Sequence, residues 1–597
     1  MTGTNAERQA VSRDLHGHAL SLVLLAELLR HYHKGDIRYA HELPPLVVED
    51  EDDRPASFPK PPRSDNHEHA KRVLSYYNNL ISDNERRFMV CLSLFDRPMH
   101  WQEKNALFAK AEYAAPLAAL SECDWQDLQA SLEAKGLLLQ MVRQAHHERN
   151  QQNHHERNRQ HHERNAVRPE LVEGLNQHRT QWDTHPLIRQ FFATQFKQQQ
   201  LSAFQQAHRV LFEYFQTVPT QDQPDTLADL EPLYRTVLHG CLAGEYYKTL
   251  HDVYQQRIDR GNEAYSTHKL GGYSQDLIVL SAFFPRGWSS VQSSGLSEAD
   301  QAWLLTEAAF CLMSLGRLAE AIAPREAGIN LYAKLENWNY AAIATETLTD
   351  LLLPLGKLAD TETAARQSID YALRTENKFQ QWSSYSKLAT VLHRHGQLST
   401  AQETFARAEQ LRLQAQPETP YLYSIYGAQY CALLLDTAHQ PEDFAAIVTR
   451  AEYGLKISTQ NNWLLAIAFD HLTLARTYSA LKKSDSACAA FTAAILAIQK
   501  AGMNMYIPEF YLARANFHLS QNELVKAKDD IDTANQTITR CGMKLYAVDA
   551  ALLLGRYYVA MNDKTSAQSY YDQAAMLIAE TGYHLRDKDL TELKRAL

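Results

Sequence analysis

The chain has 597 residues, of which 45% are hydrophobic and 22% charged, with few glycines and prolines, a composition typical of an all-helical protein. The formal net charge of −10 argues against a general affinity for nucleic acid or for an anionic membrane surface, and the longest apolar run is far below the ~20 residues that a membrane-spanning helix needs. Seven cysteines without a C-x-x-C pair favour neither a disulfide framework nor a zinc ribbon, so we expect a soluble protein of the reducing cytoplasm.

The first predicted segment, residues 1–40, holds an amphipathic helix that is entered through Gly17. A helix of this kind resembles the end of a domain, although it stands at the start of the chain. Residues 41–66 are predicted to form a linker, because six prolines and an acidic run cannot build a hydrophobic core.

Residues 67–197 are predicted to hold three helices and a strand pair. Ser82 and Ser121 are expected to cap the second and third helices, and the apolar run after Gly136 predicts a β-strand. Three helices followed by a strand pair describe a winged-helix domain. Many winged helices bind DNA through the third helix, but here that helix is acidic and phosphates would repel it, so we expect it to have a packing role.

Residues 143–178 interrupt this domain with the string HHERN, which occurs three times. Paired histidines are candidate metal ligands, but no cysteine or carboxylate is arranged to complete a closed site. We therefore predict a low-complexity insertion that lengthens the wing hairpin and binds no metal. It is similar to translated intergenic repeats of some bacterial genomes, in which an HHER-type unit leads into a PELVEG string.

The string RTQWDTHPLIRQFF follows the insertion. It predicts a strand that ends at Trp182, then His185, and then a helix that begins at Pro186, a residue favoured at the first helical position. Leu187, Ile188, Phe191 and Phe192 are expected to form the buried face of this helix. Residues 198–290 are predicted to be connecting helices and degenerate repeats.

Residues 291–597 contain internal repeats of about forty residues. Two glycine series mark them: Gly316, Gly356 and Gly396, and then Gly502, Gly542 and Gly582. The first series is predicted to lie in the turn inside a helical hairpin, and the second to end the second helix in a left-handed conformation. Small and aromatic residues recur between the glycines at fixed offsets, which favours closely packed antiparallel helices.

This pattern resembles the tetratricopeptide repeat in a form of about forty residues, from near Trp303 to the end of the chain. The resemblance implies an all-α fold, an α-solenoid of helical hairpins preceded by the winged-helix domain with its small β-hairpin. An irregular helical bundle is the alternative.

Two short segments resemble signatures of the STAND or NB-ARC nucleotide-switch ATPases. Gly17–Leu22 is similar to their G-x-P-L-A-L motif, and Asp183–Arg189 to the bacterial H-P-L-I-R form of their winged-helix motif. The resemblance implies that His185 contacts ADP phosphates, whereas a purely structural hydrogen-bonded histidine is the alternative. Ala19 and Pro186 depart from the family pattern, and the chain contains no G-x-x-x-x-G-K-[ST] loop to hold a triphosphate. We therefore expect no bound cofactor and interpret the signatures as marks of ancestry.

No nucleophile elbow, H-E-x-x-H motif or dinucleotide fingerprint is present, so we expect no catalytic residues and no enzyme. The predicted function is that of a protein-interaction scaffold or sensor arm, with a protein or peptide on the concave face lined by the first helices of successive hairpins. The alternative is the regulatory half of an ADP- or ATP-dependent signalling, transcription or phage-defence switch whose P-loop half is encoded separately or lost. Oligomerisation is left open.

The repeat register places large side chains from several first helices on this concave face. The predicted partner-binding residues are Trp303, Phe310, Met313, His393, Arg394 and Arg476. Together they would form an aromatic and basic strip suited to an acidic or amphipathic ligand. The competing hypothesis is that the helices around residues 277–284 cover Trp303 and Phe310.

Overall fold

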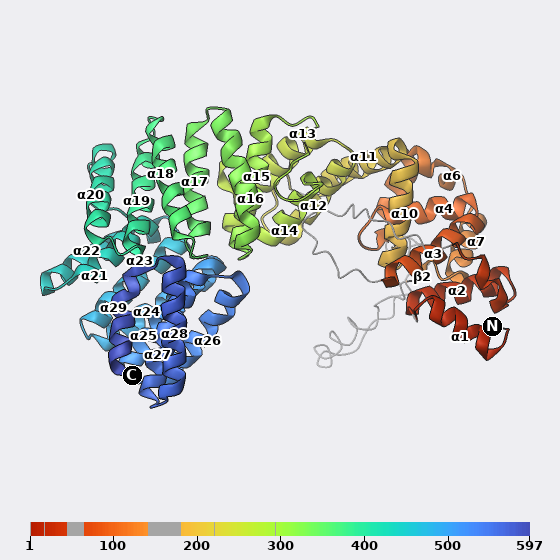
Figure 1. Ribbon diagram of the computed structural model, residues 1–597. Helices are drawn as coiled ribbons and strands as arrows, with labels where there is room; N and C mark the ends of the chain where they lie inside the picture. Colours follow the sequence, from red (N-terminus) through yellow and green to blue (C-terminus); the bar gives the residue numbers. More distant parts are fainter. Residues whose placement is uncertain (1, 17, 45–64, 141–180, 220, 293) are drawn as a thin grey trace, which may run out of the picture. The chain divides into compact units, whose positions relative to one another are not determined.

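The structure, a computed structural model, describes residues 2–16, 18–44, 65–140, 181–219, 221–292 and 294–597. The described residues are all-α apart from three short strands, and they divide into two compact units, one ending at Tyr265 and the other running from Ser266 to Leu597 (Figure 1). The predicted insertion, most of the predicted linker and Gly17 lie outside the described residues. Among the helices that the structure describes, none has the length and apolar character that crossing a membrane requires.

The first unit is built from helices that follow one another closely along the chain. They are α1 (Asn5–Asp14), α2 (Ala19–Tyr32), η1 (Ile37–Glu42), α3 (Asp65–Leu80), α4 (Asp83–Ser93), α5 (Trp101–Lys110), η2 (Glu112–Ala114), α6 (Ala115–Ala118), α7 (Glu122–Ala134), α10 (Pro186–Gln199), α11 (Leu201–Thr217), α12 (Leu227–Leu242), α13 (Tyr246–Lys248), the π-helical η3 (Thr249–Ile258) and η4 (Gly261–Glu263). One hydrophobic core joins α2 to α11.

The predicted caps of α4 and α7 are confirmed. The Ser82 hydroxyl accepts a hydrogen bond from the Glu85 amide at 3.3 Å, and the Glu85 carboxylate accepts one from the Ser82 amide at 2.8 Å. The Ser121 hydroxyl accepts a hydrogen bond from the Asp124 amide at 3.2 Å. These bonds satisfy amides that the first turn of a helix leaves without partners, so the two helices begin where the sequence predicts.

A three-stranded antiparallel sheet lies beside these helices, with strands in the order β1-β3-β2. The strands are β1 (Met99–His100), β2 (Leu139–Gln140) and β3 (Gln181–Asp183). The predicted pair is β2 with β3, whereas β1 was missed because two residues show no alternation. The buried Trp182 ring of β3 packs edge to face against Phe88 of α4 and Trp125 of α7. The winged-helix assignment of this unit stays a prediction.

The second unit is a repeat array. It begins in η5 (Tyr265–Lys269) and continues through α14 (Tyr273–Leu280) and η6 (Ser281–Phe283). Seven helical hairpins follow: α15 (Glu298–Ser314) with α16 (Leu318–Lys334), α17 (Trp338–Leu352) with α18 (Leu358–Leu373), α19 (Lys378–Arg394) with α20 (Leu398–Ala415), α21 (Ser424–Thr437) with α22 (Pro441–Gln460), α23 (Leu464–Ala480) with α24 (Ser484–Ala501), α25 (Ile507–Ser520) with α26 (Leu524–Cys541), and α27 (Lys544–Ala560) with α28 (Lys564–Thr581). The short η7 (Asn504–Tyr506) precedes α25, and η8 (His584–Arg586) and α29 (Asp587–Ala596) end the chain.

Both glycine series occupy the predicted places. Gly316, Gly356 and Gly396 have φ angles of +80°, +75° and +78° in the turns inside the first three hairpins. Gly502, Gly542 and Gly582 are left-handed C-caps of α24, α26 and α28. Glycine adopts this backbone conformation without the steric cost that a Cβ atom adds. The spacing of the glycines therefore predicted the positions of these turns and caps.

Small residues at the repeat positions let the two helices of a hairpin approach closely. Ala401, Phe405 and Ala408 of α20 are fully buried, and Ala487, Phe491 and Ala494 of α24 occupy the corresponding places, also buried. The aromatic ring fills the space between the small side chains. The fold is therefore an α-solenoid of tetratricopeptide-like hairpins, as predicted.

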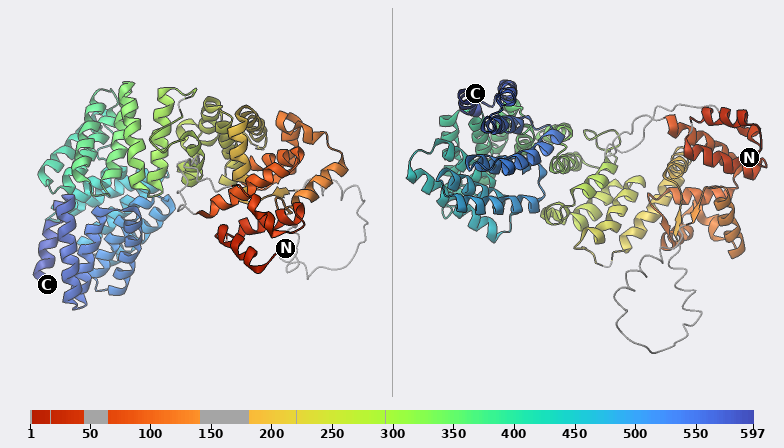
Figure 2. Two further views of the ribbon diagram at one scale, coloured as in Figure 1. Left: turned by 45° about the vertical axis from the view of Figure 1, so that its right-hand side comes forward. Right: turned by 90° about the horizontal axis from the view of Figure 1, so that it is seen from below.

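Early and late hairpins of the array contact each other, which the sequence did not predict. The turn at Gly316 contacts Cys541 at the end of α26, and the turn at Gly356 contacts Thr581 at the end of α28. The Leu545 amide donates a hydrogen bond to the Pro354 carbonyl at 3.1 Å. Figures 1 and 2 show the last hairpins, in blue, lying against the hairpins α15 to α20, in green to cyan. The concave side is thus narrowed by contacts between early and late hairpins and is not a fully open groove.

Candidate binding pocket inside the repeat array

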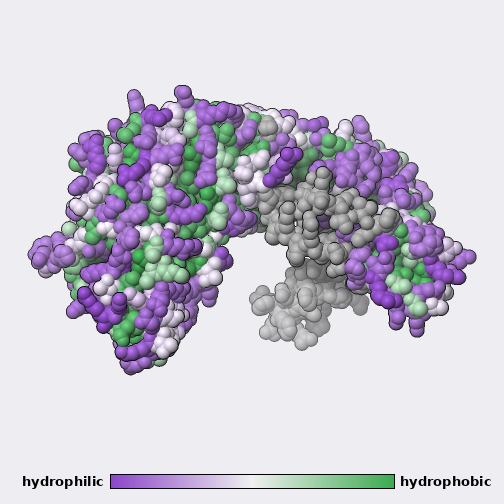
Figure 3. Space-filling model, viewed as in Figure 1, coloured by the Kyte–Doolittle hydropathy of each residue, from purple (hydrophilic) through white to green (hydrophobic). Residues whose placement is uncertain are grey.

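The array contains a pocket of about 340 Å³. Its walls come almost entirely from the first helices of five hairpins, α19, α21, α23, α25 and α27, and from the segment of η8 and α29. The expectation that first helices line the inner face is therefore confirmed. On the face drawn in Figure 3, by contrast, hydrophobic residues lie in narrow stripes between hydrophilic ones, which is ordinary for a protein surface.

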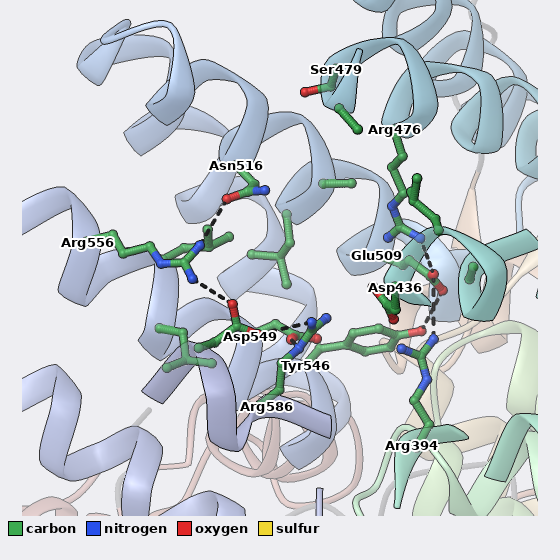
Figure 4. A pocket seen from close by; sticks show the side chains of 18 of the residues that line it. Arg394, Asp436, Arg476, Ser479, Glu509, Asn516, Tyr546, Asp549, Arg556 and Arg586 are labelled. Atoms are coloured by element: carbon green, nitrogen blue, oxygen red, sulfur yellow. Dashed lines mark hydrogen bonds and ion pairs between the residues drawn. The ribbon is translucent and has the colours of Figure 1, made fainter. Parts of the chain in front are cut away.

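One end of the pocket holds two arginines on a single carboxylate (Figure 4). Arg476 donates a hydrogen bond to Glu509 Oε1 at 3.2 Å, and the Arg394 guanidinium lies 3.8 Å from the same oxygen. The Tyr546 hydroxyl donates to Glu509 Oε2 at 3.2 Å. Burial alone would raise the pKa of Glu509, but the charges of Arg476 and Arg394 outweigh it and hold this pKa below its ordinary value. Glu509 is thus ionised at neutral pH.

The other end of the pocket holds a second charged group (Figure 4). Arg556 donates to Asp589 Oδ1 at 2.6 Å and to Asn516 Oδ1 at 3.3 Å. Arg586 donates to Asp549 at 2.6 Å and to Asp589 at 3.3 Å. Burial disfavours the charge on Arg586, but the surrounding carboxylates, Asp549 first, raise its pKa well above the ordinary value. Both ends of the pocket therefore carry charges of both signs.

Small and aliphatic side chains line the pocket between its charged groups. They are Ala432, Leu435, Ala480, Leu512, Ala513, Leu552 and Leu553. The pocket therefore offers apolar contact in its middle and charged groups at its ends, an arrangement suited to binding.

Arg394 and Arg476 are the two predicted partner-binding residues that the structure brings together. They come from α19 and α23 and share Glu509. The predicted basic strip needs a correction, however. Four arginines line the pocket together with four carboxylates, Asp436, Glu509, Asp549 and Asp589, so their formal charges cancel.

His393 is buried, with 2% of its surface exposed, and its Nε2 lies 2.8 Å from Asp436 Oδ2. Burial lowers the pKa of His393 below its ordinary value, and Asp436 opposes that shift only in part. His393 also lines a second, smaller cavity of about 40 Å³, together with Arg394, Arg476 and Glu509, so its contact with a ligand stays a prediction. Its imidazole positions the Asp436 carboxylate, which does line the pocket.

Trp303, Phe310 and Met313 lie elsewhere. The described residues that line the pocket begin with Arg394 on α19, so these three side chains of α15 are outside it. Met313 is 3% exposed, and the half-buried Phe310 ring packs edge to face against His268 and Tyr273 at 5.5 and 5.9 Å between centroids. The prediction that they join the arginines is wrong, because η5 and α14 pack on α15. Phe310 stays half-buried, and its ring neighbours His268 and Tyr273 precede residues 277–284, so the competing hypothesis of a covered side chain stays a prediction.

The carboxylates of the pocket were missed, although the repeat register contains a signal for them. Asp436, Arg476, Asn516 and Arg556 recur at intervals of forty residues, and so do Glu509, Asp549 and Asp589. Each series occupies one position of successive first helices. Alignment of the repeats by their polar residues, as well as by their glycines and alanines, would have identified both series of polar residues.

His185 lies in the first unit, at the N-terminal end of α10. Its Nδ1 accepts a hydrogen bond from the Leu187 amide at 3.2 Å, and Pro186 occupies the first helical position. The side chain is half-buried, and burial lowers the pKa of His185, so the imidazole is neutral at pH 7. The structure thus gives His185 a helix-capping role, and the nucleotide contact stays a prediction.

Comparison with known protein families gives a match in the last hairpin of the array. Residues 548–581, which span α27 and α28, match the family model of the tetratricopeptide repeat. No curated protein matches the chain.

Several solved structures match the chain at low sequence identity. One is the Rap protein complexed with competence and sporulation factor, at 13% identity and a TM-score of 0.38, covering 67% of this chain and 98% of that chain. A STAND protein with a tetratricopeptide repeat sensor from Pyrococcus horikoshii matches at 12% identity and a TM-score of 0.34, covering 99% of this chain and 72% of that one. Yeast Tom70 matches at 13% identity and a TM-score of 0.31, with 68% and 86% covered.

Proposed function

We propose that the repeat array is a non-catalytic interaction module that binds a peptide segment of a partner protein inside the solenoid. The observation that carries this proposal is the pocket itself, which five successive first helices line with charged ends and an apolar middle. At about 340 Å³ it lies at the small end of the ~300–1,000 Å³ range of ligand pockets. It therefore holds a few residues of a peptide, not the surface of a folded protein.

Binding fits the chemistry of the pocket better than catalysis does. General acid–base catalysis needs a group whose pKa lies near the working pH. Here Glu509 has a lowered pKa and Arg394 and Arg586 have raised ones, because each is held by opposite charges. These groups keep their charges at neutral pH and are suited to recognition through charge-assisted hydrogen bonds.

We further infer that the chain derives from a STAND-type signalling ATPase, with residues 67–197 as its winged-helix domain. The H-P-L-I-R string at the start of α10 and the antiparallel pairing of β2 with β3 support this inference. The alternative, a working nucleotide switch completed by a separate P-loop protein, predicts ADP binding that His185→Ala abolishes. Titration of the purified chain with ADP distinguishes the two.

A pocket-filling variant tests the peptide-binding proposal. Ala513→Phe places a ring in the apolar middle of the pocket, whereas Ala489→Phe makes the same change on the exposed surface of α24. We expect a phage-displayed library of random heptapeptides to yield enriched binders on the wild-type chain and on the Ala489→Phe control, but not on Ala513→Phe.

Circular dichroism melts check that both variants are folded. The same enriched peptides on a folded Ala513→Phe chain would show that the peptides bind elsewhere and would refute the proposal.

A further inference from the structure

Two columns of polar side chains run along the inner face of the array. The first column is Asp436, Arg476, Asn516 and Arg556, and the second is Glu509, Asp549 and Asp589. Ion pairs join the two columns. Arg476 pairs with Glu509 and Arg556 pairs with Asp589, and the sequence separation is the same in both pairs. The repeat geometry therefore arranges cations and anions in a regular pattern within one cavity.

A ligand with charges of only one sign gains little from this pattern. The four arginines and four carboxylates cancel in formal charge, so the pocket as a whole favours neither a cation nor an anion. Removing one partner from a buried ion pair leaves an uncompensated charge, which is unfavourable. A ligand that carries both signs avoids this cost, because each of its charges replaces the one it displaces.

One partly exposed charged group of each sign, Arg476 and Asp436, lies at the same end of the pocket (Figure 4). Glu509 is shared by Arg394 and Arg476, so these two arginines carry one positive charge more than their carboxylate neutralises. The Arg476 side chain is 30% exposed, so its guanidinium remains within reach of a ligand. Asp436 is 40% exposed and is bonded by His393, and the charges of Arg586 and Arg394 also act on it and help to lower its pKa. Arg476 and Asp436 occupy the same register position in neighbouring first helices.

We infer that the ligand of this pocket is a peptide segment with one acidic and one basic side chain, its carboxylate bound at Arg476 and Arg394 and its cation at Asp436. This inference rests on the proposed function and specifies the chemistry of its ligand. It replaces the aromatic and basic strip that the sequence predicts. The apolar middle of the pocket, around Ala513 and Leu552, accommodates the stem of the basic side chain.

Four pools of capped tetrapeptides test the inference on the full chain. The peptides are N-acetylated and C-amidated, so only side chains carry charge, and the pools contain one acidic and one basic residue, two acidic, two basic, or no charged residue. We expect calorimetric titration to detect binding of the mixed pool alone.

Two variants locate the charges. Arg476→Gln and Asp436→Asn should each weaken binding of the best mixed peptide by at least about tenfold, as expected for the loss of a charge-assisted hydrogen bond. Arg407→Gln and Asp485→Asn, on exposed surfaces of α20 and α24, are the matched controls and should leave the affinity unchanged.

The outcomes separate the ligand class from the proposed function. If the acidic, basic or uncharged pool binds best, the mixed-charge class is wrong and peptide binding in the pocket stands. If no pool binds while library peptides still depend on Ala513, the ligand class is again wrong. If no pool binds and the library peptides ignore Ala513→Phe, both proposals fail.

Discussion

At the scale of single residues, Glu346 of α17 is a carboxyl group whose environment conflicts with its charge. It is 7% exposed, and its Oε1 atom has no hydrogen-bond partner. The nearby Lys387 ammonium is 2.6 Å from Asp350 and belongs to that pair. Burial raises the pKa of Glu346 to about 7. Glu346 therefore keeps its proton in the folded chain under mildly acidic conditions.

The stability of the array should depend on pH through Glu346. Between its ordinary pKa of 4.5 and the folded value of about 7, the folded state holds a proton that the unfolded chain releases. The free energy of unfolding therefore falls as pH rises through this window, by up to about 3 kcal/mol. Glu346→Gln removes this contribution. The free energy of unfolding of the variant minus that of the wild type should therefore be larger at pH 8 than at pH 5.

Urea unfolding at both pH values measures this difference, with the exposed Glu403→Gln as control. An equal difference between Glu346→Gln and wild type at pH 5 and pH 8 would show that Glu346 is ionised throughout.

Phe310 gives a second prediction at this scale. Its ring packs against His268 and Tyr273, away from the pocket, so Phe310→Ala should reduce stability by about 2–3 kcal/mol, below the 3–5 kcal/mol of a fully buried phenylalanine. Peptide affinity of the folded fraction should stay unchanged. Loss of affinity with full stability would restore Phe310 to the partner-binding surface.

At the scale of elements, local signals predicted most of the fold. Ser82 and Ser121 cap their helices because a hydroxyl can accept an N-terminal amide, whatever the rest of the chain does. The turns of the later hairpins were harder to recognise, because Lys482, Asn522 and Asn562 adopt φ angles of +57° to +58° without glycine. Asparagine tolerates this conformation through local hydrogen bonding, so its presence is a weaker turn signal.

The two glycine series should respond differently to alanine. Gly502 has open space around its Cα, so Gly502→Ala costs only the strain of a left-handed residue, about 1–2 kcal/mol. At Gly356 an added Cβ would also lie 2.6 Å from Thr581 Cγ2 and 3.0 Å from Lys544 Cβ. We therefore expect Gly356→Ala to be clearly more destabilising than Gly502→Ala in chemical unfolding. Equal costs would mean that the turn does not contact α28.

At the scale of the whole repeat array, contacts between early and late hairpins determine the shape of the pocket. The Arg394 guanidinium donates to the Tyr583 hydroxyl at 3.2 Å and so links α19 to the segment before η8. Contacts between hairpins this far apart depend on the pitch of the superhelix, which sums small rotations between neighbouring repeats. Periodicity in the sequence specifies each hairpin but does not specify the total rotation along the superhelix. The sequence therefore predicted Arg394 and Arg476 on an inner face and could not predict the contacts that narrow this face.

Calorimetric titration of one library-selected peptide into the wild-type chain, Ala513→Phe and Ala489→Phe tests the central claim most directly. Binding in the pocket predicts the same affinity for wild type and Ala489→Phe, because Ala489 lies on an exposed surface of α24. It predicts a loss of at least about tenfold for Ala513→Phe, since the ring occupies the apolar middle that the peptide needs. Equal affinity of all three folded chains would contradict peptide binding inside the array.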